Sequence, residues 1–170
     1  MSEHGEGHKG ARERLGAMTS LEEILETAMS FEESAEAFYS ALRDKVGKPL
    51  RELVGELALE EAEHFRMFKA LRENPDIADA LSSNVQVPAD DHNFSKFILL
   101  PDLGPEPDDQ AILQYALSRE DAAARQYGDL AQSTPEGPVR DLFVFLANEE
   151  LEHKAELEKR YYELVHSGGV

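Results

Sequence analysis

Residues 57–64, LALEEAEH, specify the architecture of this chain more strongly than any other stretch, because a closely similar stretch, LANEELEH, recurs at residues 146–153. Each stretch contains a Glu-x-x-His motif, formed by Glu61 with His64 and by Glu150 with His153. One further glutamate lies upstream of each motif, namely Glu32 and Glu120. Four glutamates and two histidines in this arrangement are the ligand set of a carboxylate-bridged two-metal site in a four-helix bundle.

The chain is an internal duplication. Glu32 and Glu120 are 88 residues apart, and both the glutamate and the histidine of the motif recur after 89 residues, so the two copies keep their register. The segment GKPLREL at 47–53 is likewise answered by EGPVRDL at 136–142. A repeat of this length exceeds the periods of solenoid proteins, so we interpret the copies as two hairpins of one domain.

Apolar residues recur at spacings of three and four residues in four segments, which predicts four amphipathic helices. The first helix opens at a capping box formed by Ser20 and Glu23, and the third begins near Asp108. The predicted fold is all-α: a ferritin-like four-helix bundle over residues 20–166, made of two homologous helical hairpins joined by a long crossover. The hairpins are expected at 20–73 and 108–166, and the connector at 74–107.

The candidate ligands lie on the apolar stripes of these helices at one height. At a rise of roughly 1.5 Å per residue, Glu32 lies ~20 Å below the first turn, and Glu61 lies ~17 Å below it on the returning helix. Glu120 and Glu150 each lie ~18 Å from the second turn. All six residues are therefore predicted to converge at one level of the bundle.

Composition limits the class of protein. A chain of 170 residues with 41% hydrophobic content is long enough for one domain with a sizeable core. It has no cysteine, which excludes disulfides, thiolate zinc sites and iron–sulfur clusters. A formal charge of −18 argues against nucleic acid as a partner and favours cations near the surface. Residues 1–19 have no apolar run, so we interpret them as a flexible leader of a cytoplasmic protein, with no membrane segment.

The connector contains five prolines and little periodicity, and it is too long for a simple antiparallel turn. A single long crossover between the second and third helices is typical of a ferritin-like bundle. Its apolar part, FSKFILLP at 94–101, is expected to pack along the bundle or onto a neighbouring subunit. The sequence leaves both possibilities open.

The six candidate ligands suit a two-metal site for a geometric and an electrostatic reason. Glutamate and histidine three residues apart project from the same helix face, so each motif can bind one metal through the histidine while its carboxylate reaches toward a second. Four carboxylates carry a charge of −4, which two divalent cations cancel, whereas buried carboxylates without metal would be costly. Imidazole with carboxylate suits iron or manganese, with zinc as an inert substitute.

Simpler interpretations exist for each of these residues. A lone Glu-x-x-His motif on a helix is most often a solvated pair, so the argument depends on two copies in register. The flanking glutamates are interpreted mostly as surface charge: Glu60, Glu63, Glu149 and Glu152. Tyr39 and Tyr127, seven residues after the single glutamates, could hydrogen-bond a ligand carboxylate or relay electrons, or could serve only as core aromatics.

With these motifs, the chain resembles the rubrerythrin-like branch of the ferritin-like superfamily over about residues 20–165. The resemblance is carried by Glu32-x-x-Ala35-x-x-Phe38-Tyr39, by Leu57-Ala58-x-Glu60-Glu61-x-x-His64 and by their counterparts in the second half. It implies a non-haem di-iron centre that reacts with peroxide or dioxygen. It also implies ligand roles: Glu61 and Glu150 as bridging ligands, Glu32 and Glu120 as terminal ligands, and His64 and His153 each on one iron.

Two departures from the rubrerythrin pattern limit what is implied. Rubrerythrins place a further glutamate three residues after the third-helix ligand, where this chain has Ala123. They also usually carry a rubredoxin-type domain that feeds electrons to the iron site, which a chain without cysteine cannot contain. The resemblance therefore implies an external electron donor, such as a separate rubredoxin-like protein, and a homodimer.

Three functions fit these observations. The first is a di-iron oxidoreductase that reduces peroxide or dioxygen, with the four glutamates acting through the metals. The second is a ferroxidase or iron-handling protein, or, with manganese, a catalase-like enzyme. The third is a non-catalytic, metal-bound helical module that meets a partner through its connector. Six ligands for two metals leave coordination positions open, which favours a reactive site over a structural one.

Overall fold

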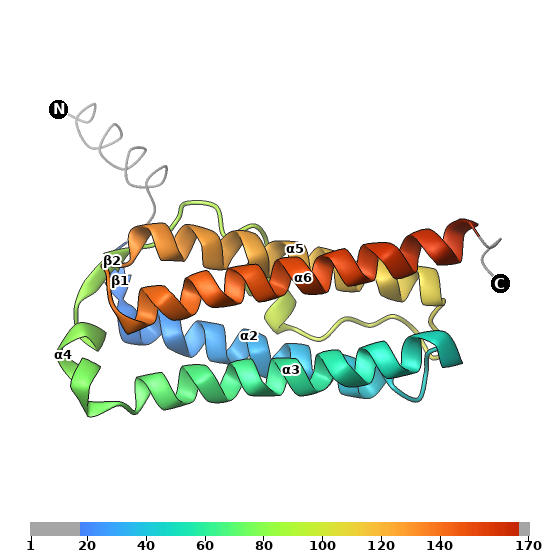
Figure 1. Ribbon diagram of the computed structural model, residues 1–170, viewed down its shortest axis with the longest axis horizontal. Helices are drawn as coiled ribbons and strands as arrows, with labels where there is room; N and C mark the ends of the chain where they lie inside the picture. Colours follow the sequence, from blue (N-terminus) through green and yellow to red (C-terminus); the bar gives the residue numbers. More distant parts are fainter. Residues whose placement is uncertain (1–17, 167–170) are drawn as a thin grey trace, which may run out of the picture.

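Four long helices form the body of the protein in the computed structural model, which describes residues 18–166. They are α2 (Leu21–Leu42), α3 (Lys48–Arg72), α5 (Asp109–Ser133) and α6 (Pro138–His166). The helices run side by side along the longest axis of the molecule (Figure 1). The prediction of an all-α bundle made of two helical hairpins is confirmed. No helix within residues 18–166 is both long and apolar enough to cross a membrane.

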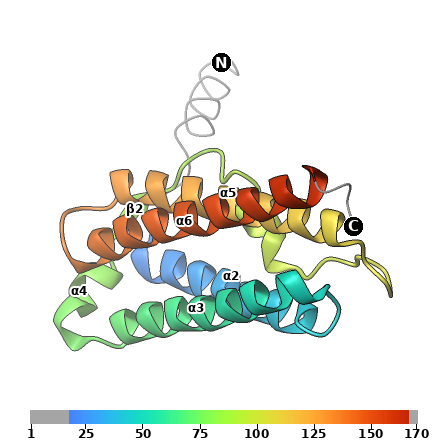
Figure 2. The ribbon, with the colours of Figure 1, turned by 45° about the vertical axis from the view of Figure 1, so that its right-hand side comes forward.

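The helices pair in the order in which they follow along the chain. Helix α2 packs against α3, and α5 packs against α6. Turning the molecule by 45° shows the α2–α3 hairpin as one layer and the α5–α6 hairpin as the other (Figure 2). Each hairpin thus contributes one face of its two helices to a shared core.

The helix ends follow the sequence signals. Ser20 caps α2, because its side chain accepts a hydrogen bond of 3.2 Å from the backbone N–H of Glu23. Asp108 caps α5 through the backbone N–H of Gln110 at 2.9 Å. Gly47 caps α3 and lies so close to the start of α5 that a Cβ atom there would meet a carboxylate oxygen of Asp109 at 2.8 Å. A side chain at residue 47 would therefore require the carboxylate of Asp109 to move.

The connector is more ordered than its prolines indicate. It holds, in chain order, η1 (Pro75–Ile77), α4 (Ala78–Leu81), β2 (Asn84–Gln86) and η2 (Phe94–Ile98). Strand β2 pairs antiparallel with β1 (Met18–Ser20), which covers the last residues of the predicted leader. Residues 1–17 lie outside the described residues, so the flexible leader stays a prediction. The small two-stranded sheet was not expected from the sequence, because it joins segments more than 60 residues apart.

The first residues of the connector's apolar part, Phe94–Ile98, pack along the bundle, whereas Leu99 and Leu100 are exposed. Element η2 contacts both α2 and α5. Phe94 is buried and stacks on Phe31 of α2 with ring centroids 4.1 Å apart. The buried guanidinium of Arg119 on α5 donates a hydrogen bond of 2.7 Å to the carbonyl of Phe97 and lies over the rings of Phe31, Phe38 and Phe97. These contacts close the side of the bundle between α2 and α5.

Candidate metal centre

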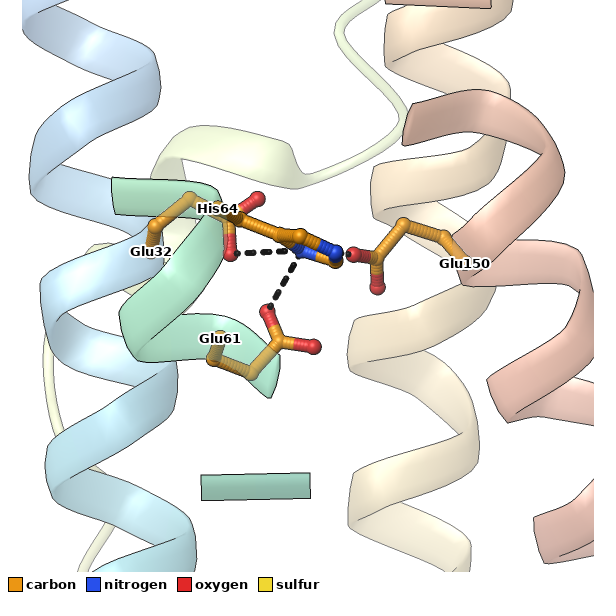
Figure 3. A group of neighbouring side chains, drawn as sticks. All are labelled: Glu32, Glu61, His64 and Glu150. Carbon is orange, nitrogen blue, oxygen red and sulfur yellow. Dashed lines mark ion pairs between the residues drawn. The ribbon is translucent and has the colours of Figure 1, made fainter. Parts of the chain in front are cut away.

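The six candidate ligands meet at the middle of the bundle. Helix α2 supplies Glu32, α3 supplies Glu61 and His64, α5 supplies Glu120, and α6 supplies Glu150 and His153. All six side chains are buried, and Glu32, Glu61 and Glu150 are 0% exposed. Figure 3 shows the carboxylates of Glu32, Glu61 and Glu150 arranged around the ring of His64. The structure thus brings together every residue that the sequence selected, although their role as metal ligands stays a prediction.

The ligand atoms form two overlapping groups. The first group joins Glu32, Glu61, His64 and Glu150, and the second joins Glu61, Glu120, Glu150 and His153. Within each group the ligand atoms lie within 4.8 Å of one another. Glu61 and Glu150 belong to both groups, whereas Glu32 and Glu120 each belong to one. This sharing is the geometry required of two bridging and two terminal carboxylates.

Each of the two shared glutamates, Glu61 and Glu150, directs one oxygen to each histidine. Glu61 places Oε2 at 3.8 Å from Nδ1 of His64 and Oε1 at 3.1 Å from Nδ1 of His153. Glu150 places Oε1 at 3.0 Å from Nδ1 of His64 and Oε2 at 3.6 Å from Nδ1 of His153. Both histidines therefore face the centre with the same ring nitrogen, and their rings are stacked at 5.8 Å.

The terminal glutamates complete the two groups in the same way. Oε2 of Glu32 lies 3.6 Å from Nδ1 of His64, and Oε2 of Glu120 lies 3.6 Å from Nδ1 of His153. The two groups thus have equivalent partners at closely similar distances. The near-symmetry follows from the internal duplication, since α5 and α6 repeat the ligands of α2 and α3 at the same helical positions.

The centre fits metal ions because its inward-facing atoms lack hydrogen-bond partners. Eight buried atoms of the six residues are in this state: Glu32 Oε2, both oxygens of Glu61, His64 Nδ1, Glu120 Oε2, both oxygens of Glu150, and His153 Nδ1. Buried polar atoms in folded proteins are almost always paired, so eight such atoms that face one centre fit a shared cationic partner. The donors are carboxylate oxygens and imidazole nitrogens, a set that suits iron, manganese or zinc.

Comparison with known proteins agrees with this geometry. The family model of rubrerythrin matches residues 23–94, which hold the first hairpin and most of the connector. Over these residues the chain is similar to rubrerythrin. Among solved structures it is similar to a Thermotoga maritima protein described as a ferritin-like diiron-carboxylate protein, with 22% sequence identity and a TM-score of 0.64. The similarity covers 85% of this chain and 96% of that one, and at this identity it shows the fold. No curated protein matches the chain.

Two tyrosines hold Glu32 and Glu120, the glutamates that each belong to one group. Tyr127 on α5 donates a hydrogen bond of 2.6 Å to Oε1 of Glu32 on α2. Tyr39 on α2 donates one of 2.6 Å to Oε1 of Glu120 on α5. Both tyrosines are 0% exposed. Of the roles that the sequence left open, the structure contains two: each tyrosine donates a hydrogen bond to a candidate ligand carboxylate, and each packs in the apolar core. The hydrogen bond fixes one oxygen of each terminal glutamate and leaves the other directed at the centre.

Burial and mutual contact shift the pKa values of the glutamates at the centre. Burial, aided by the negative charge of Glu61, raises the pKa of Glu32 well above its usual value. Burial and the charge of Glu120 likewise raise the pKa of Glu150. Burial would also raise the pKa of Glu120, but its close contacts with Glu150 and His153 outweigh burial and lower that pKa. Without metal, the carboxylates therefore share protons instead of all carrying charge.

For the two histidines, burial and the neighbouring carboxylates shift the pKa in opposite directions. Burial alone would lower the pKa of His64, but the carboxylates of Glu150, Glu32 and Glu61 outweigh burial and raise it. The pKa of His153 is raised in the same way, against burial, by Glu120, Glu150 and Glu61. Without metal, protons thus stand in for the cations that the carboxylates require.

Three residues near the centre carry information that the sequence did not reveal. Glu60, interpreted as surface charge, contacts the outer nitrogen, Nε2, of His153. Arg119, which precedes Glu120 on α5, is buried. Nothing in a single sequence marks an arginine in a helix as buried. Ala123, where rubrerythrins have a further glutamate, is 0% exposed and part of the apolar core. At this position α5 therefore offers no further carboxylate to the centre.

Proposed function

We propose that this chain is a non-haem di-iron oxidoreductase of rubrerythrin type that reduces peroxide or dioxygen. The observation that carries the proposal is the group of eight buried atoms without hydrogen-bond partners, contributed by four glutamates and two histidines. Bound iron would supply the electrons and the Lewis acidity for reduction of the oxygen species. Six protein ligands for two ions leave coordination positions at which a small substrate can bind.

The residues of the chain have separate tasks in this proposal. Glu61 and Glu150 would hold the two ions close together, because each has one oxygen directed at each metal position. Tyr39 and Tyr127 keep the terminal glutamates oriented by donating to their outer oxygens. The buried apolar residues on both sides of the ligands exclude bulk water from the centre. Electrons would come from a separate donor, such as a rubredoxin-like protein, since the chain has no cysteine.

Ferroxidase activity is the second candidate, and one observation favours it. Ala123 leaves no seventh carboxylate at the position where rubrerythrins have one, so the ligand exchange of their peroxide cycle has no evident substitute here. A net charge of −18 would also concentrate Fe(II) around the protein. In this case Fe(II) is the substrate, and the centre would oxidise more than two iron ions per chain.

The test begins with protein purified without oxygen and loaded with Fe(II). Metal analysis should give two irons per chain. Rapid loss of peroxide, sustained by a reduced rubredoxin, supports the peroxidase, whereas continued oxidation of added Fe(II) by dioxygen supports the ferroxidase. Activity that appears only after loading with manganese would support a catalase-like enzyme. Failure to retain any metal would overturn the proposal and leave a helical interaction module.

A further inference from the structure

The two histidines at the centre differ in their outer surroundings. Nδ1 of His153 faces the centre, while Nε2 on the other side of its ring contacts Oε2 of Glu60. The contact joins α6 to α3, and so it links the two hairpins directly beside the ligands. His153 is 5% exposed, and the side chain of Glu60 is 54% exposed, so the contact lies at the boundary between the core and solvent.

The internal duplication provides a direct comparison. A shift of 89 residues relates Glu60 to Glu149 as it relates His64 to His153. By this symmetry Glu149 should contact the outer nitrogen of His64. Within residues 18–166, however, Glu149 makes no hydrogen bond or ion pair with His64, and the charged partners of that histidine are Glu32, Glu61 and Glu150, all at Nδ1. Two nearly identical sequence motifs thus have different surroundings.

We infer that Glu60 is a positioning residue for His153 and that it makes the two metal positions of the duplicated bundle inequivalent. The inference rests on the proposed function, because it requires that both histidines bind metal. A carboxylate that accepts the outer N–H of a metal-bound imidazole fixes the tautomer and ring orientation and makes the inner nitrogen a stronger donor. His153 has such a partner, and His64 has none among residues 18–166, so the position at His153 binds its ion more tightly and fills first.

The ion pair between Glu60 and His153 would contribute little to folding by itself, because the side chain of Glu60 is half exposed. Its effect on metal binding has another origin, because Glu60 sets the orientation of the His153 ring and the electron donation of its inner nitrogen. Loss of such an outer partner typically weakens metal binding roughly 10- to 100-fold. Glu60 lies on the protein surface in the middle of a helix, so its replacement by alanine should not disturb folding.

The experiment compares Glu60→Ala with Glu149→Ala. Both variants remove one negative charge next to a bridging glutamate, and therefore they change the overall electrostatic attraction for metal equally. Metal-free full-length protein would be titrated with Co(II) under nitrogen and followed by its visible absorption and by NMR. In the unmodified protein, the proton on the outer ring nitrogen of metal-bound His153 should exchange slowly with water, and its metal-shifted NMR signal reports that exchange. Circular dichroism would check the helical content of each variant.

We expect two binding steps in the unmodified protein. Glu60→Ala should weaken the tighter step at least 10-fold and speed exchange of the slowly exchanging imidazole proton, while Glu149→Ala should change both steps less than about twofold. Glu60→Gln, which keeps a neutral acceptor, should recover part of the affinity. If the chain binds two Co(II) ions but both alanine variants behave alike, the inference is overturned and the proposed function stands. If the unmodified chain binds no Co(II), both are overturned.

Discussion

The hydroxyl of Tyr127 donates a hydrogen bond of 2.6 Å to Oε1 of Glu32, and thereby leaves Oε2 of the same carboxylate directed at His64. The contact crosses from α5 to α2, and Tyr39 makes the reciprocal contact from α2 to Glu120. Each hairpin therefore orients the terminal glutamate of the other. The packing of the two hairpins against each other therefore also sets the geometry of the centre.

Replacing Tyr127 by phenylalanine should destabilise the metal-bound protein by about 1–3 kcal/mol, because Oε1 of Glu32 would stay buried without its donor. The free energy of unfolding in urea, measured on protein loaded with Zn(II), tests this. Tyr115→Phe is the matched control, since the hydroxyl of Tyr115 makes no hydrogen bond with residues 18–166 and only its ring packs on Phe38 and Phe97. Equal losses for the two variants would show that the hydroxyl of Tyr127 has no special role.

Bridging and terminal glutamates should respond differently to removal. Glu61→Ala or Glu150→Ala should abolish two-metal occupancy, because each residue belongs to both ligand groups. Glu32→Ala or Glu120→Ala should keep one ion, because each residue belongs to one group. Metal content per chain after gel filtration is the measurement. The helical fold should persist, since removal of one carboxylate relieves repulsion among those that remain. Two metals retained in Glu61→Ala or Glu150→Ala would contradict the bridging assignment.

The helices and the convergence of the six ligands could be predicted because both depend on local periodicity. A stripe of apolar residues fixes which face of a helix is buried, and the rise per residue fixes the height of Glu32 and Glu61 along it. The crosswise pairing of Tyr39 with Glu120 could not be derived, because it depends on the distance between α2 and α5. Nothing in a single chain's periodicity encodes that distance.

The connector and the surroundings of His153 could not be predicted for a related reason. The strand pairing of Met18–Ser20 with Asn84–Gln86 joins distant segments that lack the length or alternation of a recognisable strand. Glu60 and Glu149 occupy the same place in two nearly identical motifs, so the sequence treats them alike. Only the relative placement of α3 and α6 separates them.

Arg119 should hold the connector against the bundle. Its guanidinium donates to the carbonyl of Phe97 at 2.7 Å, so Arg119→Met should loosen η2 and expose the Lys96–Phe97 bond. Trypsin should then cleave after Lys96 several-fold faster than in the unmodified protein, since cleavage follows the population of the opened segment. Arg125→Met is the control, because Arg125 is exposed and pairs only with Asp121 among residues 18–166. Equal cleavage rates in the two variants would exclude this role for Arg119.

The pH dependence of stability should change sign when metal binds. Burial raises the pKa of Glu32 and Glu150, and the carboxylates overcome burial to raise the pKa of His64 and His153. The folded, metal-free protein therefore binds more protons than the unfolded chain, and its free energy of unfolding should fall as pH rises from about 5 to about 8. The lowered pKa of Glu120 acts only at more acidic pH.

Metal replaces these protons, so the loaded protein should instead gain stability over the same range of pH, because its ligands must be deprotonated to bind. Urea unfolding at about pH 5, 6.5 and 8, with and without Zn(II), measures both slopes. In the metal-free state, Glu150→Gln should flatten the fall, because an amide binds no proton in either the folded or the unfolded chain. A metal-free protein whose stability rises from about pH 5 to about pH 8 would contradict the account of shared protons at the centre.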